Sequence, residues 1–448
     1  MAIQNAYVKS VVENLEKCYP NEPEYLQAVE EFLEPLQPVI ESDARYEKLN
    51  VLGRMVEAER TVVFSVPWVN DQGEVVMNHG YRLQHSSALG PYKGGLRFHP
   101  SVNLSVIKFL GFEQTFKDCL TGLPMGGGKG GADFDPKGKS EAEVMRFCQA
   151  FMNELHRHIG EDTDVPAGDI GVGGREIGYM FGQYKKLQNR FTGALTGKSL
   201  ACGGSLARTE ATGFGLCYFA AAMMKDHNKS FAGKRVIISG SGNVATYANQ
   251  KCTELGGKVI AMSDSCGYIV DENGIDYKII QQIKEVKRER ISTYVNYVPG
   301  ARYVKGCSGI WTVPCDIAMP CATQNEISAE SAKALIANGC FAVFEGSNMP
   351  CTPDAINAIK AAGLLYSPSK ASNAGGVAVS GLEMSQNSER LSWSFEEVDA
   401  QLKNIMENIY HSCAAAAAKY GMSGDIQAGA NIASFLKVAD AMLWQGVS

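Results

Sequence analysis

Three lysines in the first third of the chain stand where a lysine can do more than carry surface charge. Lys93 and Lys129 lie in glycine-rich stretches, and Lys117 lies within a helical pattern. Taken singly, each lysine is typical of an exposed charge. If the three converge, each raises the electrostatic cost of protonating the others, and a partly desolvated one acquires a lowered pKa suited to acid–base chemistry. Such a cluster also suits a substrate with two carboxylates.

A carboxylate lies on the chain break that follows these lysines. Two helical patterns, 141–159 and 175–187, are separated by the stretch 165–171, which we expect to be a loop carrying Asp169. Loops often carry functional residues, although a carboxylate there can simply cap the turn. A second expected loop, 124–131, is dense in glycine, which indicates backbone that passes close to another group.

A glycine turn in the middle of the chain has the spacing of a dinucleotide site. The residues Gly240-Ser241-Gly242-Asn243-Val244-Ala245 follow an expected strand, 235–239, and open an expected helix, 244–255. Glycines at this spacing allow the tight turn and bring a pyrophosphate close to the helix N-terminus, whose dipole favours an anion. Because Asp264 closes the next expected strand, 258–262, the full βαβ context is present and dinucleotide binding is predicted.

The residues around Asp264 bear on the choice of nucleotide. An acid at this position ordinarily accepts the ribose 2′-hydroxyl, which favours NAD. Here it is flanked by Ser263 and Ser265, and an expected helix over 276–290 supplies basic side chains that include Lys287. Serine donors with a lysine could hold a 2′-phosphate, whereas the alternative for the basic residues is a solvated helix face.

The wider pattern predicts an α/β protein of two domains. A chain of 448 residues exceeds one comfortable core, so a cleft between two domains is the default place for a small ligand. Helices are expected over 8–49, followed by a hairpin (59–66 and 75–84) and a helix over 104–120. Beyond residue 203, helices and short apolar strands alternate, which predicts a doubly wound, mostly parallel sheet. The remaining expected elements are strands 317–319, 342–344 and 364–366 and helices 211–225, 328–338, 353–361, 395–419 and 429–444.

Composition excludes several classes of partner. The net charge of −6 and the absence of any block of like charge argue against nucleic acid and against an anionic membrane. No window approaches 18 consecutive apolar residues, and the N-terminus has no apolar stretch before a cleavage site. Thirteen cysteines without a CxxC pair predict reduced thiols in the cytoplasm, with neither a disulfide framework nor a metal site.

Several long motifs together resemble one family, the hexameric glutamate dehydrogenases of the bacterial and lower-eukaryote type, over essentially the whole chain. They are GPYKGGLRF at 90–98, KFLGFEQTFK at 108–117, LPMGGGKGGADFD at 123–135, DVPAGDIG at 164–171, PCATQN at 320–325 and PSKASNAGG at 368–376. The resemblance implies a substrate-binding and oligomerisation domain of residues 1–202 plus 425–448. It implies a Rossmann-like dinucleotide-binding domain over 203–424.

The same resemblance implies roles for individual residues. Lys93 and Ser380 would hold the side-chain carboxylate of glutamate, and Lys129 and Asp169 would be the catalytic lysine and carboxylate. The α-carboxylate end would be positioned by Gln114, Lys117 and Gly168. The implied cofactor contacts are Arg208, Thr212, Gly240, Gly242, Asn243, Val244, Ser263, Asp264, Ser265, Lys287, Asn348 and Asn373.

The implied reaction is reversible oxidative deamination of L-glutamate to 2-oxoglutarate and ammonium, part of nitrogen assimilation, in a cytoplasmic homohexamer. The turn 263–265 is similar to that of NADP-dependent members, so NADP is favoured over NAD, with an NAD-specific enzyme as the alternative. A leucine- or phenylalanine-type dehydrogenase would carry apolar residues in place of Lys93 and Ser380. A pyridoxal-phosphate enzyme using Lys129 would leave the turn at Gly240 unexplained, and an inactive binding protein would not need Lys129 and Asp169.

Overall fold

The chain forms two compact units, each with its own sheet. The computed structural model describes residues 3–447. The first unit comprises residues 1–206, 377–398 and 431–448, and the second comprises 207–376 and 399–430. The segment 377–398 thus lies in the first unit although the resemblance assigned it to the nucleotide domain, because its side chains bond to the segment 197–205. No helix among the described residues is long and apolar enough to cross a membrane.

The first unit opens with short helices, as the pattern over 8–49 predicted. Their apolar faces are buried, and Asn5 starts the first helix by accepting hydrogen bonds from the backbone amides of Tyr7 and Val8. The helices are α1 (Ala6–Cys18), α2 (Pro23–Leu33), the 3₁₀ turn η1 (Glu34–Leu36), α3 (Gln37–Ser42), α4 (Arg45–Lys48) and α5 (Val51–Val56).

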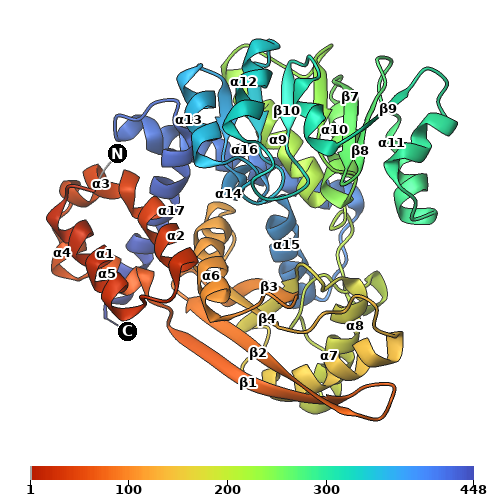
Figure 1. Ribbon diagram of the computed structural model, residues 1–448. Coiled ribbons are helices and arrows are strands. Elements are labelled where there is room, and N and C mark those ends of the chain that lie inside the picture. The colour runs from red at the N-terminus through yellow and green to blue at the C-terminus, as the bar shows by residue number, and fades with distance from the viewer. Residues whose placement is uncertain (1–2, 448) are drawn as a thin grey trace. The chain divides into compact units, whose positions relative to one another are not determined.

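A five-stranded sheet follows, in the order β1-β2-β4-β3-β5. The strands are β1 (Arg60–Val69), β2 (Val75–Ser86), β3 (Tyr92–Phe98), β4 (Gly127–Ala132) and β5 (Asp164–Gly168). β1 and β2 form the predicted hairpin, which is drawn in orange in Figure 1. The expectation of loops was wrong for residues 127–131 and 165–168, which are extended and hydrogen-bonded in β4 and β5. Asp169 itself lies just beyond β5, in a tight turn.

Helices cover both faces of this sheet. On one face, α6 (Leu104–Leu120) packs against β4 and β2, and Asn103 caps its start through the amide of Val106. On the other, α7 (Glu141–Leu155) and α8 (Gly174–Gln188) enclose an aromatic core in which Phe134 stacks on Phe147. Figure 1 shows α6 apart from the α7–α8 pair. The short 3₁₀ turn η2 spans Leu200–Cys202.

The second unit contains the predicted doubly wound sheet, in the order β12-β11-β10-β6-β7-β8-β9. Five strands are parallel, while β8 and β9 add an antiparallel edge beside β7 that the sequence did not predict. The strands are β6 (Arg235–Ile238), β7 (Lys258–Asp264), β8 (Gly267–Val270), β9 (Arg302–Lys305), β10 (Ile317–Met319), β11 (Ala342–Phe344) and β12 (Leu365–Ser367).

Most helices of the second unit lie where the sequence predicted them, with one exception. The expected helix 276–290 is wrong beyond residue 286, because α11 continues as a π-helix and Arg288 adopts a left-handed conformation with φ of 56°. The helical elements within this unit are α9 (Ala211–Asp226), α10 (Asn243–Glu254), α11 (Tyr277–Gln281), the π-helix η3 (Gln282–Val286), η4 (Ile291–Asn296), η5 (Cys307–Thr312), α12 (Ala329–Ala337), α13 (Pro353–Ala361) and α14 (Ser369–Ser372). The helices α15 (Gly375–Glu389), α16 (Phe395–Lys419) and α17 (Ile426–Gln445) contain the points where the chain passes from one unit to the other.

A fully buried ion pair joins the strands of the first unit. Arg82 on β2 and Asp164 on β5 have no exposed surface, and Arg82 Nε lies 2.9 Å from Asp164 Oδ2. Arg82 also donates to the carbonyl of Gly94 on β3, and Gln84 donates to the same carboxylate. The network satisfies both charges and ties three strands together.

We expect Arg82→Met to lower the free energy of unfolding of the first unit by about 3–5 kcal/mol, because Asp164 would remain buried without its cation. The measurement is the midpoint of the urea transition followed by circular dichroism. Arg157→Met is the matched control, since Arg157 pairs with Glu154 at the surface, and it should change the free energy by less than about 1 kcal/mol. Equal midpoints for the two variants would contradict the expectation.

Candidate active site

One face of the first sheet gathers the charged residues singled out in the sequence. Side chains alternate along a strand, so Lys93 and Arg97 of β3 share a face. Lys129 of β4 lies on that face too, because an added Cβ at Gly111 of α6 would stand 3.4 Å from Lys129 Cβ. Asp169 follows β5 directly, and its Cβ would lie 2.8 Å from a side chain at Gly95. The sheet and α6 thus enclose the cationic and acidic groups.

Lys129 and Asp169 form a partly buried ion pair. Lys129 Nζ lies 3.0 Å from Asp169 Oδ2, with 7% and 19% of the two side chains exposed. Burial lowers the pKa of Lys129, and the nearby Arg97 lowers it further, while Asp169 opposes the change. Burial alone would raise the pKa of Asp169, but Lys129 and Arg97 outweigh it and hold that pKa below its usual value. A lysine and a carboxylate in contact, each with a lowered pKa, are suited to exchange a proton with a bound group.

Lys93 lies wholly inside the unit. Its ammonium group donates to Thr196 Oγ1 at 2.7 Å and to the carbonyl of Val165 at 3.0 Å, and none of its surface is exposed. Ser380 of α15, also buried, belongs to the same unit. The segment carrying Thr196 is held to α15 by the buried pair of Lys198 Nζ and Glu383 Oε1 at 2.7 Å. α15 thus supports the surroundings of Lys93 as well as carrying Ser380.

Gln114 and Lys117 reach this region from α6. The pKa of Lys117 is lowered to about 8, chiefly by burial, with Asp118 opposing the change and Lys129 adding to it. Gln114 Nε2 donates to Asp118 Oδ1 at 2.5 Å, while Asp118 Oδ2 is buried without a partner among the described residues. Burial raises the pKa of Asp118 to about 8, against the opposing effects of Lys93, Lys117 and Lys129. Asp118 therefore lies within electrostatic reach of all three lysines.

Glycines allow the strands and α6 to approach closely enough to bury these charges. A Cβ on Gly127 would lie 1.9 Å from Thr115 Oγ1 of α6, and a Cβ on Gly94 would lie 1.6 Å from the carbonyl oxygen of Gly128. A Cβ on Gly168, the last residue of β5, would lie 2.6 Å from the carbonyl oxygen of Val172. The glycine density of 124–131 therefore reflects close packing within a sheet.

In the second unit, the glycine turn has the geometry of a phosphate site. Gly240 adopts a φ of 85°, and its amide donates to Ser263 Oγ at 2.9 Å. Gly242 is the N-cap of α10, whose first residues are Asn243 and Val244, and an added Cβ there would meet nothing within 4 Å. The backbone at the start of α10 is thus open to an anion, which the helix dipole attracts.

Asp264, the acid at the end of β7, accepts hydrogen bonds from backbone amides of the second unit. Asp264 Oδ1 accepts a hydrogen bond from the amide of Cys266 at 2.8 Å, and Oδ2 accepts one from Ile291 at 3.1 Å. Only 6% of the side chain is exposed. Arg290, in contrast, is exposed and donates to Ser265 Oγ at 2.8 Å. The turn therefore presents hydroxyl and guanidinium donors outward and keeps its carboxylate inward.

The remaining residues predicted to contact the cofactor are Lys287, two asparagines, Thr212 and Arg208. Lys287 is exposed and donates to Tyr297, outside any regular helix. Asn373 Nδ2 donates to Asn348 Oδ1 at 2.9 Å, and Asn373 Oδ1 is buried without a partner among the described residues. Thr212 and Arg208 both lie beside Gly376. A Cβ added to Gly376 would stand 2.6 Å from Thr212 Oγ1 and 3.6 Å from the Arg208 guanidinium group.

A buried carboxyl supports the asparagine loops. Glu345, at the end of β11, accepts hydrogen bonds from the hydroxyl of Tyr366 at 2.9 Å and the amide of Ser369 at 2.8 Å. Burial raises its pKa to about 7. These contacts join the loop that carries Asn348 to the short helix α14, which Asn373 follows.

Three residues that contact the predicted site residues were not predicted from the sequence. Arg97 bonds to Asp169, Thr196 to Lys93 and Asp118 to Gln114. Arg97 could have been found, since it lies four residues after Lys93 on the same face of an extended stretch. Asp118 directly follows Lys117 but carries no motif of its own. Thr196 lies far along the chain from Lys93, and no local pattern marks it.

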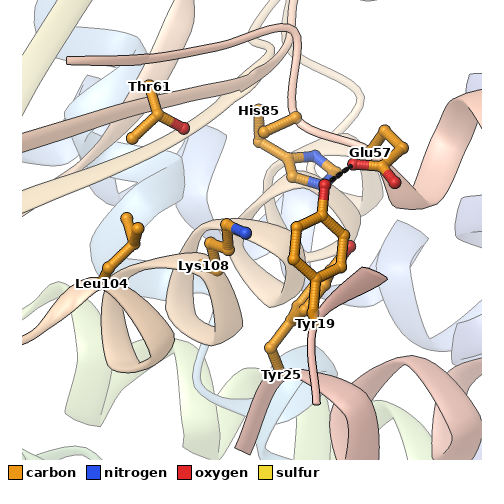
Figure 2. A pocket seen from close by; sticks show the side chains of 8 residues that line it. Tyr19, Tyr25, Glu57, Thr61, His85, Leu104 and Lys108 are labelled. Atoms are coloured by element: carbon orange, nitrogen blue, oxygen red, sulfur yellow. Dashed lines mark hydrogen bonds between the residues drawn. The ribbon is translucent and has the colours of Figure 1, made fainter. Parts of the chain in front are cut away.

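A pocket of about 220 Å³ lies elsewhere in the first unit. Its lining includes Tyr19, Glu57, His85 and Lys108, shown in Figure 2. Tyr19 donates to Glu57 Oε2 at 2.7 Å, and Lys108 Nζ lies 3.6 Å from the centre of the Tyr19 ring. Lys108 and Lys117 are nine residues apart on α6, so they lie on roughly opposite sides of the helix. The pocket is therefore separate from the Lys129–Asp169 region.

Comparison with known proteins gives consistent matches over the chain. The family model described as Glutamate/Leucine/Phenylalanine/Valine dehydrogenase matches residues 203–446, and the model of the Glu/Leu/Phe/Val dehydrogenase dimerisation domain matches 58–186. The NADP-specific glutamate dehydrogenase of Helicobacter pylori is 54% identical, covering 98% of this chain and 100% of the relative. The NAD(P)-specific glutamate dehydrogenase of Xylanibacter ruminicola is 56% identical, covering 98% and 99%. The crystal structure of Plasmodium falciparum glutamate dehydrogenase superposes with a TM-score of 0.96 at 52% identity, covering 99% of this chain and 95% of that one.

We expect Gly94→Ala to destabilise the first unit by about 1–3 kcal/mol, because the new methyl group would overlap the carbonyl of Gly128 and push β3 from its neighbour. The matched control is Gly178→Ala in α8, where an added Cβ meets nothing within 4 Å and alanine should stabilise the helix by about 0.5–1 kcal/mol. Thermal unfolding measured by calorimetry separates the two. A Gly94→Ala transition at or above the wild-type temperature would refute the packing argument.

Proposed function

This chain belongs to the Glutamate/Leucine/Phenylalanine/Valine dehydrogenase family, and on that premise we propose that it catalyses the reversible oxidative deamination of L-glutamate. The products are 2-oxoglutarate and ammonium, and NADP accepts the hydride. The observation that carries the proposal is the Lys129–Asp169 ion pair on the same sheet face as the buried cation Lys93. The first unit would bind the substrate, and the second would bind the dinucleotide.

The charge of the first unit suits a dicarboxylate. Lys93 is a buried ammonium group, and a carboxylate that replaced one of its present oxygen partners would form a charge-assisted hydrogen bond. We assign Lys93 and Ser380 to the side-chain carboxylate. Gln114, Lys117 and Gly168 are assigned to the α-carboxylate end. Two separated cations at this site favour glutamate over a substrate with an apolar side chain.

Lys129 and Asp169 supply the proton transfers. In the oxidative direction, Asp169 accepts a proton from the substrate amine, so an N–H bond breaks and an O–H bond forms. The Cα–H bond breaks as its hydride leaves, and the nitrogen lone pair forms the C=N bond of 2-iminoglutarate. Lys129 then assists water in attacking that carbon, and ammonia departs to give 2-oxoglutarate. The lowered pKa of Lys129 favours this exchange.

The second unit fits a dinucleotide. The open backbone at Gly242 suits a pyrophosphate, and the buried, unpartnered Asn373 Oδ1 suits an amide or hydroxyl donor. We assign Arg208, Thr212, Asn243, Asn348 and Asn373 to cofactor binding, together with Gly240, Gly242 and Val244 at the turn. A bound nicotinamide would supply the acceptor for the hydride that leaves Cα, and such a transfer requires the reacting atoms to be about 3–3.5 Å apart.

The end of β7 favours a 2′-phosphate over a free ribose hydroxyl. Asp264 is engaged by backbone amides, whereas Ser265 and Arg290 face outward beside it. Ser263 braces the turn and Lys287 is exposed nearby in sequence. NADP is therefore the favoured cofactor, and NAD is the alternative. One relative is named as NADP-specific and another as NAD(P)-specific.

An exposed sheet edge supports self-association. β1 is an edge strand of ten residues. Its outer face exposes Val63 and Val69 beside Val75 and Met77 of β2. A long, exposed apolar edge strand is a template for pairing with another chain. We propose that a second copy covers this edge and that the assembly is a homohexamer in the cytoplasm, with glutamate, 2-oxoglutarate and ammonium as its small-molecule partners.

The first test is the initial rate of NADPH oxidation, and separately of NADH oxidation, with 2-oxoglutarate and ammonium. We expect a higher kcat/KM with NADPH, because Ser265 and Arg290 can bind its 2′-phosphate. Omission of ammonium is the control and should abolish the rate. A preference for NADH would assign Asp264 to the ribose despite its backbone contacts. No oxidation of either cofactor would reject the proposed reaction.

Lys93→Leu tests the substrate assignment. We expect kcat/KM for 2-oxoglutarate to fall by about 10- to 150-fold, equivalent to the 1.5–3 kcal/mol of a charged hydrogen bond. The value for 4-methyl-2-oxopentanoate should fall less or rise, because that substrate has no second carboxylate. Lys185→Leu, on the exposed face of α8, is the control. An equal fall for both substrates would mean that Lys93 supports the fold and does not select the substrate.

A further inference from the structure

Arg97 contacts the same carboxylate oxygen as Lys129. Its Nε donates to Asp169 Oδ2 at 2.8 Å, and Lys129 Nζ lies 3.0 Å from that oxygen. The three side chains are shielded from water, with 16%, 7% and 19% exposed for Arg97, Lys129 and Asp169. Two cations thus converge on one oxygen of a single carboxylate.

The other oxygen of Asp169 is left available. Within residues 3–447, no group donates a hydrogen bond to Asp169 Oδ1. This oxygen is not fully buried, and 19% of the side chain is exposed. A carboxylate oxygen that retains access and lacks a partner can receive a proton. The two oxygens are therefore distinguished by their surroundings, one held by cations and one open.

We propose that Arg97 is a positioning residue that holds Oδ2 of Asp169 and so reserves Oδ1 for the substrate amine. This inference rests on the proposed function, in which Asp169 accepts the proton. The proton moves from the substrate nitrogen to Oδ1, the N–H bond breaks and the O–H bond forms. Arg97 gains and loses no proton in this step.

Lys129 cannot perform this duty alone. A group that exchanges protons with the substrate is at times neutral, and a neutral Lys129 would no longer hold Asp169 as an anion. An arginine stays protonated at every working pH, and its guanidinium is planar and directional. Arg97 therefore keeps the carboxylate ionised and oriented in both protonation states of Lys129. The lowered pKa of Lys129 is consistent with this division of roles.

The strand register places Arg97 for this role. Leu96 pairs with Gly168 of β5, so Arg97 follows the end of that pairing while Asp169 follows Gly168. Gly95 has no side chain, which lets Asp169 approach the strand on the face that Arg97 shares. The contact is thus built into the sheet, with no need for a mobile loop.

The experiment is the pH dependence of kcat/KM for L-glutamate with NADP⁺, between about pH 5 and 9, for the wild type, Arg97→Met and Arg97→Lys. Removing a cation from Asp169 raises the pKa of the carboxyl group, so activity is lost at higher pH as the medium is acidified. We expect the acid limb of Arg97→Met to move upward by about 1–3 pH units. Arg97→Lys keeps the charge and should return the limb toward the wild type, with a lower kcat because the directional Nε is missing.

Controls separate this role from a structural one. NADPH affinity, measured by fluorescence titration, should be unchanged in both variants, because Arg97 lies in the first unit and the glycine turn in the second. Arg157→Met, an exposed arginine of the first unit, should keep the wild-type profile. An unmoved acid limb in Arg97→Met would overturn the proposal. If that variant does not fold, a wild-type kcat in Arg97→Lys overturns it instead.

The proposed function can fail independently. A wild-type enzyme that does not turn over glutamate rejects the reaction before any variant is compared. A wild type that does, together with an Asp169→Asn variant of undiminished kcat, rejects the proton transfer on which the role of Arg97 depends. A shifted limb in Arg97→Met with an inactive Asp169→Asn supports both.

Discussion

The close approach of α6 to β4, a strand of four glycines, Lys129 and Ala132, is the constraint on which the first unit depends. Gly127 leaves no room for a side chain between β4 and Thr115, and Gly111 on the helix leaves none beside Leu83 of β2. Any larger residue at these points would separate helix from sheet. Because they touch, water is excluded around Lys129, and its pKa falls through burial. The chemistry proposed for this protein follows from that packing.

Burial makes the number of charges as important as their identity. Lys93, Lys117, Lys129 and Arg97 face this region, while Asp169 is the carboxylate held ionised among them. Asp118 has a raised pKa and so offsets less of the positive charge. An excess of cations in a poorly solvated place is unfavourable until an anion binds. In the proposed function, a substrate with two carboxylates would supply the missing negative charge, so the same electrostatic cost would give both affinity and selectivity.

The two units use carboxylates in different ways, according to what surrounds each group. Asp169 has side-chain cations and one open oxygen, so it is free to act on a substrate. Asp264 accepts hydrogen bonds from backbone amides at both of its carboxylate oxygens and therefore stabilises a turn. Glu345, buried among a hydroxyl and an amide, joins two loops. Residue type alone does not distinguish these roles, whereas hydrogen-bond partners do.

Local patterns were sufficient to predict most elements and to select candidate site residues. The hairpin, α6, the βαβ unit and the parallel core of the second sheet follow from periodicity and turn residues, because those signals act between near neighbours. Long motifs identified Lys129 and Asp169. The glycine stretch was wrongly predicted to be a loop. Composition shows that glycine is flexible, but it does not show the neighbouring strands and helix that leave no space for a side chain.

Tertiary structure decided what the chain does with those residues. The contacts of Arg97 with Asp169, and of Lys93 with Thr196, span 72 and 103 residues. The inward turn of Asp264 depends on the amide of Ile291, 27 residues away. Such pairings depend on strand register and close packing, which no local pattern encodes. The sequence by itself therefore determined the elements and the candidate groups, and the folded structure determined their charge, orientation and access, because electrostatic energy depends on distance and burial.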